Sequence, residues 1–425
     1  MALKEQFEIP GGLKKWSYAL MGVGVLTLIL GIIFLHPFSG GHGEAHGEEA
    51  YGATKFWMAL MHNSIYWLLV VAASFFFIAA TTLAQAGWPL VFRRVPEAIS
   101  GGLNVLGPVT LVILLAYVWI ADDHHIYHWK DAAHLDEKLQ AKSGFLNPTF
   151  YTVVSIAAVS LWIWFRNWFR KLSITEDQSV QRQTANYWRT LAVSAAFLVT
   201  YGLTVLSTLP WLWLMSIDAH WFSTMYSWYT FASSWVAGLS LMMLFVVYLK
   251  NHGYLEFVNE EHIHDIGKFI FAFSIFWTYL WFSQFMLIWY SNQPEETAYF
   301  IDRLGYGGKG DGPFRAMFLL NLIINFLAPL LILMRRGSKR SYTVVTLMAV
   351  IIIFGHWLDF YQMITPGPLK ELGKDSNPIS HFVYSLGIAA GFLGLVIFLT
   401  ARYLTKASLL PKNHPLVKES IIHHT

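Results

Sequence analysis

A histidine and an aspartate three residues apart are the most informative polar side chains of this sequence. His356 and Asp359 lie in an apolar run, and their i, i+3 spacing places both on one face of a helix. Asp359 lies five residues before the end of that run, roughly 8 Å inside it at 1.5 Å per residue. An ionisable side chain inside a membrane span costs about 2.5 to 3.5 kcal/mol, which invites a functional interpretation. The pair predicts either a group that relays protons or binds a quinone oxygen, or a structural clasp between helices.

Four further ionisable residues lie in or beside apolar runs. His62 could bind a quinone, line a proton path or pack as a satisfied core histidine. Asp218 and His220 occupy a very short turn beside Trp221, where interfacial anchoring alone would explain both. His381 opens the last apolar run and is expected at the membrane interface. We therefore take His356, Asp359, His62, Asp218 and His220 as candidates for a proton path or a quinol site, and we assign no catalytic residue.

Neutral polar residues inside the apolar runs cost less free energy to place in a membrane than ionisable residues do. Asn321 and Asn325 share a helix face at i, i+4, so they are expected to join helices by hydrogen bonds or to line a hydrated half-path. The loop at residues 40–49 alternates glycine with histidine and glutamate. So much glycine would preorganise a metal site poorly, and we expect a solvated loop there.

The composition defines the elements that must position these residues. The chain has 425 residues, of which 55% are hydrophobic and only 13% charged, whereas soluble domains carry about 25% charged residues. This excludes a water-soluble enzyme. Apolar runs of about 20 residues can each cross a hydrocarbon core roughly 30 Å thick. We predict one all-α integral membrane domain over residues 1–425, with ten transmembrane helices at 16–35, 57–84, 99–120, 145–165, 188–215, 221–249, 266–290, 314–334, 342–364 and 381–404.

Weak internal similarity suggests how these spans are grouped. Residues 57–63 resemble residues 221–227, and Trp211-Leu212 resembles Trp357-Leu358. Internal repeats of this kind are common in polytopic membrane proteins. The repeat predicts two four-helix bundles, flanked by two peripheral spans. Spans two to five form the first bundle (57–215), spans six to nine form the second (221–364), and the peripheral spans are 16–35 and 381–404.

The basic residues predict the orientation. Alternate sides of the ten spans hold 20 and 9 of the 29 lysines and arginines, and the side with 20 includes both termini. Cytoplasmic loops are the basic ones, so both termini are expected in the cytoplasm.

The residues available for ligation limit the cofactors. The chain has no cysteine, so it cannot ligate an iron–sulfur cluster or attach haem covalently. Only His62, His356 and His381 could ligate a haem between helices, and none is expected near the midplane. We therefore predict that this chain binds no metal or redox cofactor of its own, while quinol stays open as a ligand. The nearly charge-free midplane also disfavours a stand-alone transporter, which would have broken helices around a central site.

Two aromatic runs carry a family resemblance. DAHWFSTMYSWY at 218–229 and FMLIWYS at 285–291, together with ten spans in two apparent bundles, resemble the NrfD-like, or polysulfide reductase membrane-subunit, family. Within it, the chain is similar to the smaller NrfD-like subunit of bacterial alternative complex III.

The resemblance implies a multi-pass subunit of a respiratory quinol:cytochrome c oxidoreductase in the bacterial inner membrane. The implied partners are a multihaem cytochrome c, an iron–sulfur protein, the larger NrfD-like paralogue and a terminal oxidase, so that haem c and iron–sulfur clusters belong to partner subunits. For this chain it implies a structural role with proton conduction. The alternative is that this chain itself binds and oxidises quinol.

Overall fold

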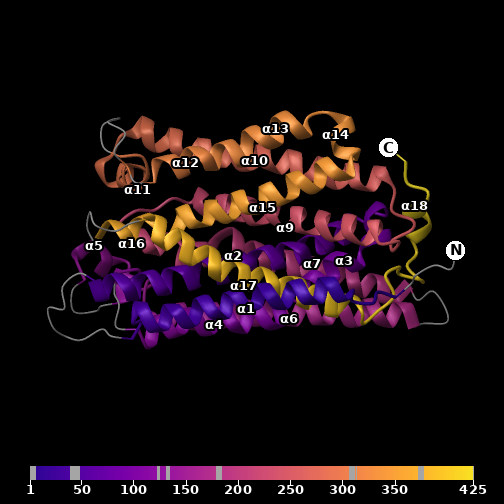
Figure 1. Ribbon diagram of the computed structural model, residues 1–425, viewed down its shortest axis with the longest axis horizontal. Coiled ribbons are helices and arrows are strands. Elements are labelled where there is room, and N and C mark those ends of the chain that lie inside the picture. Colours follow the sequence, from indigo (N-terminus) through magenta and orange to yellow (C-terminus); the bar gives the residue numbers. More distant parts are fainter. Residues whose placement is uncertain are drawn as a thin grey trace.

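The computed structural model describes residues 6–38, 48–121, 125–130, 135–178, 184–305, 312, 314–371 and 378–424, and every regular element in these ranges is a helix (Figure 1). In this described part, ten segments are long and apolar enough to cross a membrane, which confirms an all-α, multi-pass membrane architecture. Residues 40–47 of the loop predicted at 40–49 lie outside the described residues, whereas residues 48 and 49 already belong to a helix. The spanning segments are α1 (Gly11–Leu35), α2 (Glu48–Leu83), α3 (Arg94–Ser100) with α4 (Leu103–Trp119), α6 (Pro148–Gln178), α7 (Thr184–Leu203) with η3 (Thr204–Thr208) and α8 (Leu209–Trp213), α9 (Met225–Asn251), α10 (Glu260–Ser291), α12 (Arg315–Leu322) with η6 (Ile323–Leu327) and α13 (Ala328–Leu333), α15 (Tyr342–Ile364) and α17 (Pro378–Leu404).

Short helices cover the two ends of the spans. One end carries α14 (Arg336–Arg340) and α18 (Val417–Ile421), and the opposite end carries α5 (Glu137–Ala141), α11 (Pro294–Leu304) and α16 (Pro366–Glu371) (Figure 1). Three single turns, η1 (Trp88–Phe92), η2 (His128–Lys130) and η4 (Met215–Asp218), join longer elements.

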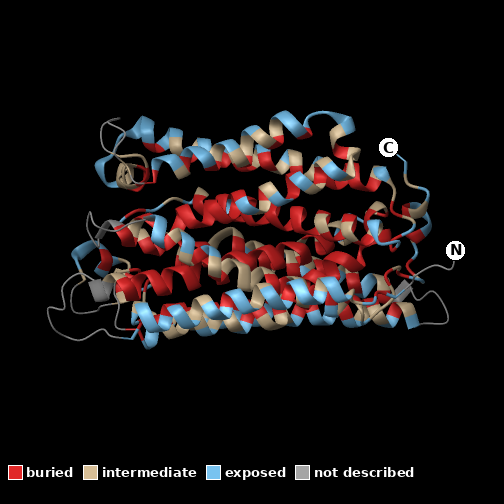
Figure 2. Ribbon diagram, viewed as in Figure 1, coloured by how far each residue is buried: buried red, intermediate tan, exposed pale blue. Residues whose placement is uncertain are grey.

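Two helices form the centre of the molecule. α2 and α9 are apolar around their whole circumference, and most of their residues are buried by other helices (Figure 2). A helix that is apolar on all sides is expected in such a position. α2 packs against α4, α7 and α17, α9 packs against α10 and α15, and the two central helices also contact each other. The grouping of these helices into two four-helix bundles stays a prediction.

The first and last spans pair closely. α1 packs against α17 along most of its length, and a Cβ built on Gly391 would lie 2.8 Å from the Cα of Gly24. Such a distance leaves no room for any side chain, so the two glycines let the backbones meet. Small residues serve this purpose in membrane helix pairs, where lipid removes the hydrophobic driving force.

The fourth span is longer than the sequence predicts. α6 continues to Gln178, whereas the apolar run ends near residue 165. Arg166 and Arg170 lie on the added part and are buried, because they bind groups on α3. Charged residues that resemble a loop in sequence therefore belong to a spanning helix. The sixth span also differs, since α9 begins at Met225 rather than at residue 221.

Candidate functional site

The carboxylate of Asp359 lies at the centre of a polar cluster between four helices. It is fully buried on α15. One oxygen, Oδ1, accepts hydrogen bonds from the Tyr229 hydroxyl and, at 2.7 Å, from Asn321 Nδ2. The other, Oδ2, accepts from Ser233 Oγ at 2.7 Å and from Trp277 Nε1 at 2.9 Å. Four donors thus point at one carboxyl group, and both of its oxygens accept hydrogen bonds.

Ser233 links this carboxylate to His356. The serine oxygen lies 3.0 Å from His356 Nδ1, while Nδ1 and Asp359 Oδ2 are 4.0 Å apart. A serine has one hydroxyl proton. When the serine hydroxyl donates this proton in its hydrogen bond to Asp359 Oδ2, the serine oxygen can accept a hydrogen bond from His356 Nδ1–H. His356 Nε2 is buried and has no hydrogen-bond partner among the described residues. The predicted pair thus meets through a hydroxyl, which can pass a proton between the two groups.

Two asparagines extend the cluster along the eighth span. Asn325 Nδ2 donates to Asn321 Oδ1 at 2.6 Å, and Asn321 donates in turn to Asp359. Asn325 lies in η6, a π-helical turn that ends two residues before Pro329. Proline removes a backbone N–H and its ring crowds the carbonyl four residues earlier, here that of Asn325, which explains the widened turn.

Gly355 lets this turn approach α15. A Cβ at residue 355 would lie 2.2 Å from Asn325 Oδ1 and 2.3 Å from Ile324 Cγ2. The asparagine chain therefore depends on a glycine one helical turn before Asp359.

A narrow cavity separates the cluster from the end of the molecule that carries α11. Its volume is about 10 Å³, room for about one water molecule. The polar side chains around it are Tyr229, Asn321, Gln284, Gln362, Tyr299 and Arg303. Water here would touch both the Tyr229 hydroxyl and the amides, so the cavity can continue a hydrogen-bonded path away from Asp359.

Arg303 closes the far side of the cavity. It is buried, donates to the carbonyl oxygens of Tyr299 at 2.6 Å and Gln362 at 3.0 Å, and lies over the Tyr299 ring. Its Nη2 is 3.6 Å from Asp218 Oδ2. Burial raises the pKa of Tyr299 to about 12, so this phenol stays neutral beside the guanidinium. Asp218 thus belongs to the same polar region as Asp359, through Arg303.

His62 lies in a different polar cluster. Its Nε2 lies 2.9 Å from the Trp357 carbonyl oxygen, which only accepts, and its Nδ1 lies 3.0 Å from Ser385 Oγ. Asn63 joins the same residues, because it donates to Ser385 and accepts from Trp357 Nε1 at 2.8 Å. Both ring nitrogens of His62 are therefore satisfied, and the contacts tie α2, α15 and α17 together. This geometry favours the packing interpretation of His62.

Two other histidines from the sequence analysis lie outside the Asp359 cluster. His381, in the first turn of α17, is fully buried by other helices, and its Nδ1 lies 3.0 Å from the Tyr361 hydroxyl. Its location at the membrane interface stays a prediction. Tyr361, three residues before the end of α15, packs against His381 with the ring centroids 5.3 Å apart. His220 is largely exposed and lies 3.4 Å from Asp136, and it is not part of the Asp359 cluster.

A buried ionic cluster at the opposite end was missed by sequence reasoning. Glu97 on α3 forms ion pairs with Arg94 at 2.6 Å, with Arg93 at 3.3 Å and with Arg170. It also accepts a hydrogen bond from Ser173 Oγ at 2.8 Å. Arg93-Arg94 next to an apolar run suggested only a basic loop. The signal that could have located the cluster is the i, i+3 and i, i+4 spacing of Glu97 from these arginines.

No protein-family model and no curated protein matches this chain. Within the described residues, no three histidine, aspartate or glutamate side chains converge as a metal site would require. The chemistry that the geometry itself supports is proton transfer through Asp359, Ser233 and His356.

Proposed function

We propose that this chain is an integral membrane subunit of a respiratory quinol:cytochrome c oxidoreductase, similar to the NrfD-like ActF subunit of alternative complex III. Its role there is to build the membrane part of the complex and to conduct protons. The redox centres, haem c and iron–sulfur clusters, would belong to the partner subunits. These are a multihaem cytochrome c, an iron–sulfur protein and a larger NrfD-like paralogue, with a terminal oxidase as a further partner.

The observation that carries the proposal is the buried Asp359 carboxylate with its four donors. A purely structural contact could have used a neutral amide at lower cost. Quinol oxidation releases protons together with electrons, so a complex that performs it needs groups that accept and pass protons. A buried carboxylate linked to an imidazole by a hydroxyl suits that task.

The proton route follows the hydrogen bonds. When His356 Nε2 takes up a proton, the proton on Nδ1 moves to Ser233 Oγ and the serine proton moves to Asp359 Oδ2, at heavy-atom distances of 3.0 Å and 2.7 Å, which leaves a neutral imidazole. Rotation of the protonated carboxyl group then brings this proton to the Tyr229 oxygen, while the Tyr229 hydroxyl proton passes to water in the cavity. Asp218, which pairs with Arg303 at the far side of the cavity, accepts the proton there.

The orientation gives this route a direction. The distribution of basic residues favours both termini in the cytoplasm of a bacterial cell, with the chain in the inner membrane. Under this topology the α11 end, which holds Asp218 and Arg303, faces outward. The Asp359 cluster would then release protons on the side where a cytochrome c subunit operates.

A second candidate function is quinol binding by this chain, and a different feature favours it. An apolar groove of about 590 Å³ runs between α9, α15 and α17 and ends at Trp357, whose ring packs against His62 at 4.8 Å between centroids. The groove is large enough for an isoprenoid chain. Density for a quinone headgroup beside Trp357 in the purified complex would favour this candidate, while an empty or lipid-filled groove would favour the first.

The decisive experiment is to tag this chain, purify what accompanies it and record redox spectra. We expect co-purifying subunits with c-type haem and quinol oxidation activity in the complex. The chain purified alone should give no reduced-minus-oxidised signal, because it has no cysteine and no facing histidine pair was expected. A chain that purifies without such partners would contradict the proposal. So would a stoichiometric b-type haem signal that is lost on changing His62 or His356.

A further inference from the structure

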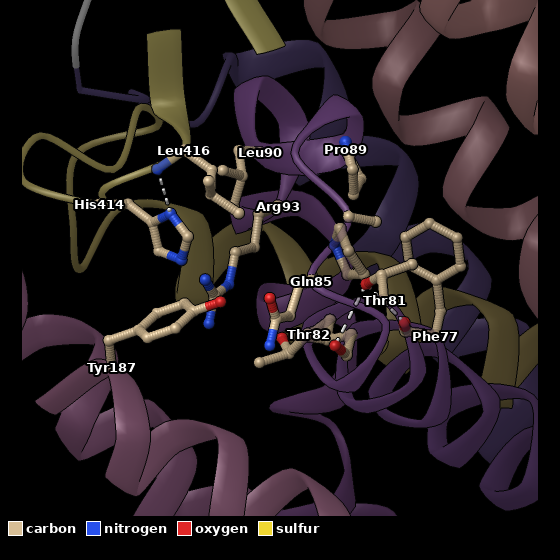
Figure 3. Close-up of a pocket in the computed structure, with 13 residues that line it drawn as sticks. Phe77, Thr81, Thr82, Gln85, Pro89, Leu90, Arg93, Tyr187, His414 and Leu416 are labelled. Carbon is tan, nitrogen blue, oxygen red and sulfur yellow. Dashed lines mark hydrogen bonds between the residues drawn. The ribbon is translucent and has the colours of Figure 1, made fainter. Parts of the chain in front are cut away.

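A second polar pocket lies at the end of the molecule that carries α18, whereas the cavity beside the Asp359 cluster faces the opposite end, which carries α11. It is bounded by the end of α2, the turn η1, the start of α7 and the tail that precedes α18. Arg93, Gln85, Tyr187 and His414 contribute its polar side chains together with the threonines at 81 and 82. Figure 3 shows the Arg93 guanidinium pointing into the space between Tyr187, Gln85 and His414.

Arg93 has a free donor although it is buried. Only 5% of the residue is exposed, and its Nη2 has no hydrogen-bond partner among the described residues. Its Nε lies 3.3 Å from Glu97 Oε1 in an ion pair that is not a hydrogen bond, so Nε also lacks a hydrogen-bond partner among the described residues. An unsatisfied buried donor of a charged group costs about 1 to 3 kcal/mol or more. A ligand that accepts this hydrogen bond would remove that cost.

The other polar groups of the pocket also offer donors. His414 Nδ1 accepts the Leu416 backbone N–H at 3.3 Å, so in the neutral ring the proton lies on Nε2. Burial lowers the pKa of His414 to about 3, which keeps the ring neutral. The Tyr187 hydroxyl and the Gln85 amide provide further donors at the edge (Figure 3). Converging N–H and O–H groups around a guanidinium are suited to an oxyanion.

The nearby carboxylates do not fill the pocket. Glu97 and Asp177 bind Arg94, and Glu176 lies in the same cluster. The four arginines Arg93, Arg94, Arg166 and Arg170 face these three acids, which leaves an excess of positive charge. The exposed carboxylate of Glu419 lies against Gly87 and is not among the groups that line the pocket.

Exposed tryptophan places the pocket at the level of lipid headgroups. Trp188, next to Tyr187 on α7, is 59% exposed, and Trp168 on α6 is 41% exposed. Tryptophan is enriched at membrane–water interfaces, where phosphates lie. Basic pockets between helices on the cytoplasmic side bind phospholipid headgroups. The free volume of about 10 Å³ admits a single phosphoryl oxygen, with the rest of the headgroup outside.

We propose that the pocket around Arg93 binds a phosphate oxyanion, and that the source of this group is the headgroup of an anionic membrane phospholipid. A non-bridging phosphate oxygen accepts the hydrogen bond of Arg93 Nη2, and Tyr187, Gln85 and His414 surround the group. The bound lipid would hold the tail before α18 against α2 and α7. This site is independent of the proton route and of the partners proposed above.

The test measures lipid binding to the purified full chain by native mass spectrometry. Phosphatidylglycerol is titrated against phosphatidylcholine, and inorganic phosphate is added as a competitor. Arg93→Gln should weaken phosphatidylglycerol binding roughly 10-fold or more, as expected for loss of a charge-assisted hydrogen bond. Arg335→Gln, a change at an exposed arginine, should leave binding unchanged. Competition by inorganic phosphate would support the proposal, because it would show that the pocket recognises the phosphate group of the lipid, whereas binding of inorganic phosphate without any phosphatidylglycerol binding would overturn the lipid as its source.

Two milder variants keep the proposal testable if Arg93→Gln fails to fold. Tyr187→Phe removes only a hydroxyl, and Arg93→Lys keeps the charge but removes the free guanidinium nitrogen. Each should weaken binding at least roughly 2-fold. Equal binding of phosphatidylglycerol by the native chain and all folded pocket variants would overturn the proposal, as would the absence of any phosphate-dependent binding.

Discussion

Replacing Asp359 by asparagine separates a proton-transfer role from a structural one. The side chain keeps its size, but it loses the charge and one of its two accepting atoms. In the native chain, Oδ1 accepts from Tyr229 and Asn321, and Oδ2 accepts from Ser233 and Trp277. The new amide nitrogen of Asp359→Asn must therefore face one of these two donor pairs.

The structural cost of this change can be worked out from the partners. Each donor pair contains one hydroxyl, Tyr229 or Ser233, which can turn and accept from the new amide. Each also contains one fixed N–H, from Asn321 or Trp277, which cannot accept. Asn321 cannot turn over without losing its bond to Asn325. One buried donor is left without a partner, at a cost of about 1 to 3 kcal/mol, so Asp359→Asn should still fold.

The functional cost should be larger. An amide neither takes up nor releases a proton, so the route from His356 through Ser233 ends at residue 359. Removal of a positioned proton-transfer group lowers rates by roughly 10² to 10⁴. We expect assembled Asp359→Asn complex to lose quinol-driven turnover or coupled proton release, with a changed dependence on pH. The assay is turnover of the purified complex with a quinol and cytochrome c, with proton release followed by a pH indicator.

Controls distinguish this result from general damage. Glu295→Gln makes the same chemical change at an exposed surface ion pair with Lys138 and should keep native activity. Assembly is checked by subunit content and thermal unfolding. Normal turnover and proton release at every pH tested, in fully assembled Asp359→Asn, would reduce the Asp359 cluster to a structural clasp and refute the reasoning.

Three more predictions follow from other parts of the chain. Burial lowers the pKa of His414 to about 3, so as pH falls below about 6.5 the unfolded chain takes up a proton on this residue and the folded chain does not. The free energy of unfolding should therefore drop by about 2 kcal/mol between pH 7 and pH 5 because of this residue. In His414→Gln the thermal-unfolding temperature should depend less on pH over that range. Gly355→Ala should destabilise the chain by about 1 to 3 kcal/mol because the new methyl group meets Asn325, whereas Gly337→Ala, with open space around it, should unfold like the native chain. A single cysteine introduced at residues 40–47 of this cysteine-free chain should react with an impermeant maleimide in intact cells, and one placed beside Thr425 should not; the reverse labelling would overturn the topology.

The polar residues show how far sequence reasoning reaches into the site. The insertion cost singled out His356 and Asp359, and their spacing placed them on one face. The sequence also offered Asn321 and Asn325, although their link to Asp359 depends on the distance between two spans that are far apart in the chain. Arg303 was not a candidate, because it lies outside every apolar run and only burial shows its role. The partners of His62 could not be predicted from the sequence either, since Trp357 and Ser385 lie about 300 residues away along the chain.

The sequence alone determined that this chain is an all-helical membrane protein with ten spans, and approximately where each span lies. The reason is that a bilayer requires each segment to satisfy its own backbone hydrogen bonds, so length and apolarity are local properties. Tertiary structure decided which polar groups meet. Whether Asp359 faces four donors, whether His381 is buried and whether Arg170 belongs to a helix or a loop depend on contacts between distant helices, and local hydrophobicity carries no information about such contacts.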